Sequence, residues 1–65
     1  MTGQARRGDV VRVHPHTIRD GRDLGGTLLT TTTDGDREAD FTEYTGGPVI
    51  HLPLAAVDLV FHQGA

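Results

Sequence analysis

Two glycine-containing dipeptides, Asp34-Gly35 and Gly46-Gly47, divide residues 26–52 into three runs with the composition of β-strands. Dipeptides of these types supply the positive φ angles that two-residue hairpin turns need. The first run ends in four consecutive threonines, and branching at Cβ makes threonine a poor helix former but a good strand former. This stretch therefore predicts three antiparallel strands joined by two tight turns. No other feature constrains the fold as strongly.

The threonine run, residues 30–33, has two interpretations. A half-exposed strand accounts for it by β propensity alone, whereas a face of hydroxyl groups that hydrogen-bond a ligand is the functional alternative. We favour the strand.

Alternating apolar residues locate strands within this stretch, which holds the second strand at 26–33, and on both sides of it. In residues 9–14, Val11 and Val13 fall on one face, and in residues 37–45 Phe41 is expected to point inward. A fourth strand covers 49–52, and a last strand at 58–62 follows a short 3₁₀ turn that begins with a proline.

A polar loop at residues 15–25 separates the first two strands. We expect a turn at Asp20-Gly21 near its middle and a buried apolar anchor at each end, Ile18 and Leu24. A loop of this length in so small a domain is a candidate functional segment.

The chain has 65 residues and no cysteine, so we expect one domain without disulfides. The predicted organisation is a flexible N-terminal arm at 1–7, a folded domain at 8–62 and a loose tail at 63–65. Small β domains without a metal or disulfide often gain burial by self-association, which makes a homo-oligomer a hypothesis. No apolar run approaches the ~20 residues that span a membrane, and no secretory signal is recognisable. A cytoplasmic location is the default expectation.

Five short strands, a long loop after the first and a 3₁₀ turn before the last are the layout of an SH3-like small barrel. The segments GDVVRV (8–13) and IHLPLAAVDLV (50–60) resemble the ends of many such barrels. The segment GDVVRVHPHTIRDGRDLGGTLL (8–29) resembles the start of a family of small uncharacterised actinobacterial proteins with that fold. That family tends to carry Tyr/Val-Arg-Trp in the third strand, where this chain has FTEY (41–44). The resemblance implies an all-β, five-stranded SH3-like small barrel with one 3₁₀ turn before the last strand, and it implies no function.

A more remote resemblance is to the plasmid-borne type II dihydrofolate reductases, SH3-like barrels in which four chains form one active pore. The segment VIHLPLAA (49–56) is similar to their last strands. The pore segment of that family, Val-Gln-Ile-Tyr, falls on Val49, Ile50, His51 and Leu52. Only the valine matches, and the pore lysine is missing. Because of these differences, an oligomeric enzyme with a shared central pore is only the third hypothesis for this chain.

Residues that could carry chemistry are few. Among the four histidines, His14, His16 and His51 would need to converge to bind a metal ion, and we interpret them as polar residues at strand ends. Cysteine and serine are absent, and no threonine has a base at a spacing that suggests nucleophilic catalysis. We therefore predict no catalytic residues, no metal and no cofactor.

Charge is unevenly distributed along the chain. Arginines concentrate in the first third, at Arg6, Arg7, Arg12, Arg19 and Arg22. Acidic residues crowd the central hairpin, at Asp34, Asp36, Glu38, Asp40 and Glu43. This pattern predicts a basic end and an acidic sheet edge, the latter either a guard against aggregation or a dock for a basic protein surface. The net charge of -3 and the pI of about 5.6 disfavour nucleic acid as a partner, because nucleic-acid-binding domains are usually basic.

We predict a non-catalytic binding or regulatory module that contacts a protein partner through the loop at 15–24. The candidate binding residues are the polar side chains of this loop and one tyrosine of the central hairpin: His16, Arg19, Asp20, Arg22, Asp23 and Tyr44. A nucleic-acid-binding small barrel is the first alternative. Self-association remains open, and no membrane contact is expected.

Overall fold

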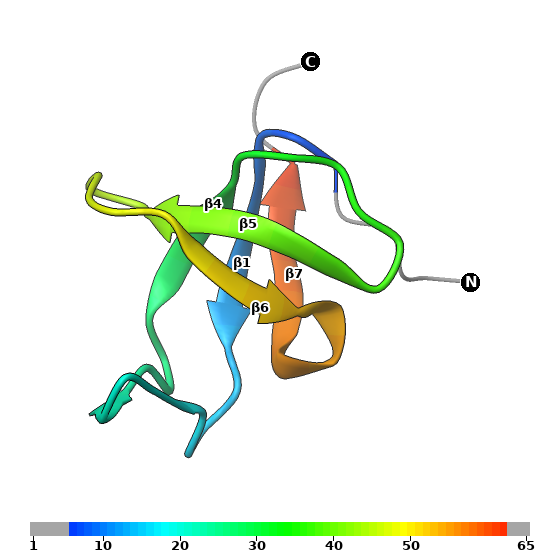
Figure 1. Ribbon diagram of the computed structural model, residues 1–65. Helices are drawn as coiled ribbons and strands as arrows, with labels where there is room; N and C mark the ends of the chain where they lie inside the picture. Colours follow the sequence, from blue (N-terminus) through cyan, green and yellow to red (C-terminus); the bar gives the residue numbers. More distant parts are fainter. Residues whose placement is uncertain (1–5, 63–65) are drawn as a thin grey trace.

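The computed structural model describes residues 6–62, which form two antiparallel sheets and one 3₁₀ turn (Figure 1). The larger sheet has five strands in the spatial order β6-β5-β4-β1-β7. These strands are β1 (Asp9–Val13), β4 (Leu28–Thr31), β5 (Glu38–Glu43), β6 (Ile50–Pro53) and β7 (Val57–His62). The smaller sheet is a hairpin of β2 (Ile18–Arg19) and β3 (Arg22–Asp23), and the 3₁₀ turn η1 spans Leu54–Ala56.

The prediction of an all-β domain is confirmed for the described residues, with the 3₁₀ turn directly before the last strand. Figure 1 shows β5 and β6 passing in front of β1 and β7, so that the sheet curls over itself. The sheet does not close, because β6 and β7 are its two edges and no described residues pair them. The five predicted main strands are present, whereas a closed barrel is not found.

The core lies inside the curl of the sheet. Val11 and Val13 of β1 are buried there, as the alternation predicts, and Phe41 of β5 has no exposed surface. Leu24, the expected anchor at the end of the polar loop, also belongs to this core. Val10 points away from these valines along the strand and is nevertheless fully buried. The alternation therefore predicted the inner face of β1 but not the burial of Val10.

Of the three predicted tight turns, only the one at Asp20-Gly21 is a two-residue connection between strands. Asp20 and Gly21 have φ angles of 54° and 78° and join β2 to β3, so the turn predicted there is confirmed. The expected two-residue turn at Asp34-Gly35 is wrong, because neither residue has a positive φ and the connection between β4 and β5 covers 32–37. The connection between β5 and β6 is also longer than two residues and covers 44–49.

The described part of the expected N-terminal arm is Arg6 and Arg7. The backbone N–H of Arg6 donates to Oδ2 of Asp9 at 3.1 Å, and the backbone N–H of Arg7 donates to Oδ1 of Asp34 at 2.6 Å. The remainder of the arm and the tail at 63–65 lie outside the described residues. Within residues 6–62, the structure has no helix that is long and apolar enough to cross a membrane.

Candidate functional site

An open groove of about 720 Å³ runs between the β2–β3 hairpin and the strand end opposite it. Figure 1 shows this hairpin projecting from one end of the curled sheet, below the connection between β5 and β6. One wall of the groove comes from the hairpin and the residue after it: Ile18, Arg19, Asp20, Arg22 and Leu24. The other wall comes from the end of β5, the following connection and β6: Glu43, Pro48, Val49, Ile50 and His51.

Each wall of the groove carries a strongly exposed aliphatic side chain. Ile18 is 59% exposed and Val49 is 62% exposed, the two highest values among the large hydrophobic residues that the structure describes. The expectation that Ile18 is a buried anchor is therefore wrong. The β2–β3 hairpin has only two residues in each strand, which is too short to bury Ile18 as well as Leu24 in the core.

The charged side chains of the hairpin leave one cation unpaired. Arg19 and Arg22 are directly opposite each other across the turn, an arrangement of like charges that destabilises a strand pair. Nη2 of Arg22 lies 3.4 Å from Oε2 of Glu43 on the opposite wall. The side chain of Arg19 makes no hydrogen bond or ion pair with any residue in the described part of the chain. The groove thus presents a free guanidinium beside its apolar surface.

Three of the six candidate binding residues lie in this groove, namely Arg19, Asp20 and Arg22. The other three do not line it. His16 is exposed with a φ of 65°, Oδ1 of Asp23 accepts a hydrogen bond from the Gly25 backbone, and Tyr44 is 48% exposed in the turn after β5. The prediction that the loop at 15–24 binds a partner therefore identified residues of one wall of the groove only.

The second wall was missed because its members belong to a distant part of the chain. Pro48 and Val49 follow the Gly46-Gly47 pair, whose signal indicates a turn but not the element that the turn faces. Only the curl of the sheet brings this connection opposite the hairpin. The exposure of Val49, 62%, is the one signal that marks it once the fold is known.

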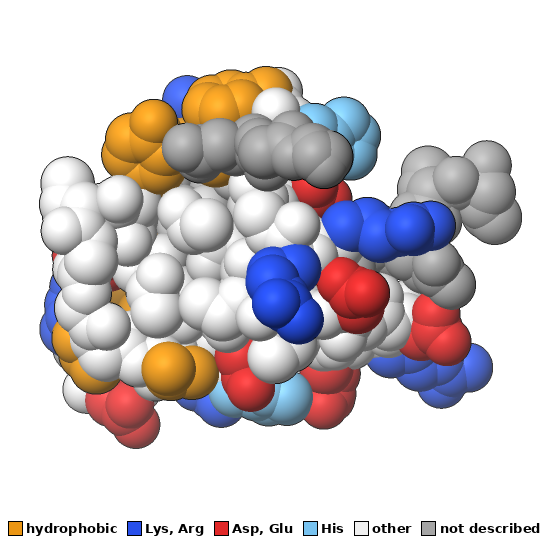
Figure 2. Space-filling view, turned by 90° about the horizontal axis from the view of Figure 1, so that it is seen from above, with side chains coloured by type: hydrophobic (Ala, Val, Ile, Leu, Met, Phe, Trp, Pro, Cys, Tyr) orange, Lys and Arg blue, Asp and Glu red, His pale blue; other side chains and the backbone are white. Residues whose placement is uncertain are grey.

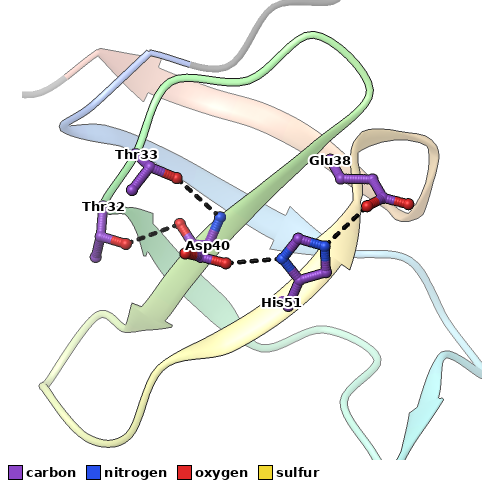
Figure 3. Close-up of polar contacts among 5 residues, drawn as sticks. All are labelled: Thr32, Thr33, Glu38, Asp40 and His51. Carbon is purple, nitrogen blue, oxygen red and sulfur yellow. Dashed lines mark hydrogen bonds and ion pairs between the residues drawn. The ribbon is translucent and has the colours of Figure 1, made fainter.

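At the β6 end of the groove, His51 is held between two carboxylates (Figure 3). Its Nδ1 lies 2.7 Å from Oδ1 of Asp40, and its Nε2 lies 2.9 Å from Oε1 of Glu38. Asp40 is the direct partner of His51 in the β5–β6 register, and Glu38 is two residues along the same strand. A neutral imidazole can donate only one hydrogen bond, so both contacts together require the doubly protonated ring. With both nitrogens engaged, His51 has no free atom to act as a general base.

Two threonines hold Asp40 in place. The hydroxyl of Thr32 donates to the carbonyl oxygen of Asp40 at 3.1 Å, and the Asp40 backbone N–H donates to the hydroxyl of Thr33 at 3.2 Å (Figure 3). These hydroxyl groups are used inside the molecule. Thr31 is buried. The strand interpretation is confirmed for Thr30 and Thr31, which belong to β4, whereas Thr32 and Thr33 lie in the connection after it.

We expect the stability of the chain to depend on pH through His51. The hydrogen bonds to Asp40 and then to Glu38 raise the pKa of His51 from its usual 6.5. Because the folded pKa is raised, the stabilisation is complete below pH 6.5 and is lost as pH rises through the folded-state pKa. The difference in unfolding free energy between the unaltered chain and His51→Gln should follow this course. NMR titration of the His51 ring measures the midpoint directly.

Asp40→Asn is the matched variant for this titration. It keeps the shape of the side chain and removes the charge, so the midpoint of His51 should fall toward 6.5. Added salt should lower the midpoint as well, since all three side chains are partly exposed to solvent. A His51 midpoint at or below 6.5 in the unaltered chain would contradict the assignment.

The expected separation of a basic end from an acidic edge is wrong for the face shown in Figure 2. Arginine and acidic side chains are interspersed there, without a patch of one sign. The hydrogen bond of Arg7 to Asp34 and the ion pair of Arg22 with Glu43 explain part of this mixing. The two charge classes are separate in sequence but meet in the fold, because the sheet brings the N-terminal strand beside the central hairpin.

The histidines that could have formed a metal site do not converge. Nε2 of His14 lies 2.9 Å from Oδ2 of Asp58, on a different strand from the carboxylates that hold His51. Within residues 6–62, no three His, Cys, Asp or Glu side chains are grouped so that they could hold a metal ion.

Comparison with known proteins gives no relative: no protein-family model, no curated protein and no solved structure matches this chain.

Proposed function

We propose that the chain is a non-catalytic binding module that holds a segment of a protein partner in the groove beside the β2–β3 hairpin. The observation that supports this best is the position of Ile18 and Val49, which are strongly exposed on opposite walls of one groove. Single apolar side chains on a surface are ordinary, whereas two that line a shared depression form a place for an apolar group.

The charges of the groove favour an acidic neighbour for that apolar group. The guanidinium of Arg19 has no partner among the described residues, and that of Arg22 contacts Glu43. A carboxylate on the partner would relieve the repulsion between the two arginines and form a charge-assisted hydrogen bond. The segment that fits is therefore an extended peptide with an apolar side chain next to Asp or Glu.

We also propose that the fold is an open form of the SH3-like small barrel. The order of the five strands, the long excursion after β1 and the 3₁₀ turn before β7 support this. The unpaired edges of β6 and β7 are the point at which it departs from a closed barrel.

Selection of random displayed peptides on the immobilised chain tests the binding proposal. The recovered peptides should share an apolar residue adjacent to an acidic one. Ile18→Ser should weaken the recovered peptides about tenfold, because burying the exposed half of an isoleucine is worth about 1–1.5 kcal/mol. Arg19→Glu should change the preference from acidic to basic residues.

Tyr44→Ser is the matched control, since Tyr44 is 48% exposed but does not line the groove. It should change affinity by less than about twofold. Equal losses for Tyr44→Ser and Ile18→Ser, or the recovery of no peptide above background, would contradict the proposal.

The alternatives have less support. A nucleic-acid-binding barrel would show salt-dependent retention on DNA that Arg19→Ala and Arg22→Ala remove, but arginine and acidic side chains alternate on the face in Figure 2. For an enzyme with a shared pore, His51 would have to supply a reactive group, and both of its nitrogens are engaged.

A further inference from the structure

The two edges of the five-stranded sheet are protected to very different degrees. Exposed sheet edges tend to pair with other chains unless they are short, charged or interrupted by proline. The β6 edge has four residues, ends in Pro53, which lacks an N–H group, and carries His51 between two carboxylates. All three devices are present there.

The β7 edge has none of these devices at its centre. It is six residues long and contains no proline. Leu59, Val60 and Phe61 are consecutive and are 54%, 39% and 43% exposed. Figure 2 shows hydrophobic side chains gathered along one border of the molecule. Pairing would stabilise an edge with this composition, because its free backbone groups gain hydrogen bonds while its apolar side chains are removed from water.

We propose that two copies of this chain associate through β7, which pairs antiparallel with β7 of the partner subunit about a two-fold axis at Val60. In this register Leu59 faces Phe61 of the partner subunit, an aliphatic–aromatic pair of the kind that stabilises antiparallel strands. A two-fold axis uses the same surface on both copies and leaves no further edge of this kind exposed.

The polar side chains at the two ends of the paired segment are complementary. Asp58 comes to face His62 of the partner subunit, on both sides of the axis. The side chain of Asp58 is 75% exposed and that of His62 is 69% exposed. Asp58 uses Oδ2 for its contact with His14, and its Oδ1 makes no contact within the described residues. His62 uses only Nδ1 for its contact with Asp9, and Nε2 makes no contact within the described residues. A parallel arrangement would instead put like residues together.

A β-bulge lies at the centre of the paired segment Asp58–His62. The register between β1 and β7 shifts between Val10 and Val11, and Val60 consequently has no partner residue on β1. Bulges increase the twist of an edge and often serve to block pairing. Here the extra residue is a valine and not a charged residue, so the bulge adds apolar surface at the centre of the edge.

Sedimentation velocity over a concentration series tests the association. The unaltered chain should shift from monomer to dimer as concentration rises. Val60→Lys should abolish the shift, because it places two like charges on the axis. Thr45→Lys, which adds the same charge to an exposed turn on the β5–β6 side, should leave it unchanged. A chain that stays monomeric throughout, or equal effects of the two variants, overturns the proposal.

Oxidative cross-linking tests the register and does not depend on the folding of Val60→Lys. The chain has no cysteine, so a single introduced thiol reports on one position. Val60→Cys should form a disulfide-linked dimer at least about tenfold faster than Thr45→Cys, because the axis brings two copies of the same residue within disulfide distance. A mixture of Leu59→Cys and Phe61→Cys should give mainly the mixed dimer. Rates for Val60→Cys no higher than for Thr45→Cys would show that β7 is not the interface.

Discussion

Replacement of Phe41 by alanine should remove much or all of the stability of the folded chain. Phe41 has no exposed surface and lies at the centre of the core, paired with Thr31 on one side and Ile50 on the other. Truncation of a buried phenylalanine costs about 3–5 kcal/mol. A domain of this size has a total stability of about 3–10 kcal/mol. The loss therefore consumes much or all of the stability, and urea unfolding followed by circular dichroism measures it.

The second phenylalanine of the chain is the matched control. Phe61 is 43% exposed at the sheet edge, so Phe61→Ala should cost only about 1 kcal/mol. The comparison is made in dilute solution, where association of the chain does not contribute to stability. Similar losses for the two variants would mean that the core is not centred on Phe41.

Gly35→Ala should cause the second largest loss of stability, because the added Cβ atom collides with the backbone of Glu38. A Cβ atom at Gly35 would overlap the carbonyl oxygen of Glu38 and would lie 3.2 Å from Cβ of Ala39. Neither neighbour is the end of a flexible side chain, so the start of β5 has to move. Forced insertion of this kind costs about 1–3 kcal/mol. Thermal unfolding monitored by circular dichroism measures the loss.

A second measurement separates this cause from a general loss of stability. Displacement of Glu38 should weaken its contact with His51, so the His51 midpoint should fall in Gly35→Ala. Gly46→Ala serves as the control because its φ is 98° and a Cβ there meets nothing within 4 Å. It should cost about 1 kcal/mol through backbone strain and leave the His51 midpoint unchanged. Equal midpoints in the two variants would contradict the collision at Glu38.

Local patterns predicted the strands well and the turns unevenly. The alternation of Val11 and Val13 located β1 because burial on one face of a sheet has a period of two residues. The same Asp-Gly signal succeeded at Asp20-Gly21, where Arg19 pairs directly with Arg22. It failed at Asp34-Gly35 because the cross-strand pair nearest to this dipeptide is Thr31 with Phe41, which leaves a connection much longer than two residues. Gly35 is required for close approach to Glu38 and not for a positive φ.

The candidate site was predictable on one side only. The hairpin stood out as a charged loop, which gave Arg19, Asp20 and Arg22. The opposite wall and the exposure of Ile18 depend on how far the sheet curls. That curl follows from long-range strand pairing, which has no signature in a short window of sequence. The cluster around His51 was missed for the same reason, because its carboxylates come from the neighbouring strand.

The position of β1 between β4 and β7 has a consequence for how the fold assembles. Asp9 pairs with His62 and Val13 with Val57, so one neighbour of β1 comes from the opposite end of the described chain. Such a contact closes a long loop and is entropically expensive until the intervening strands are in place. A fragment that lacks residues 57–62 would leave β1 with a bare edge and Val11 and Val13 without their cover. The domain should therefore behave as one cooperative unit that cannot be divided into halves that fold separately.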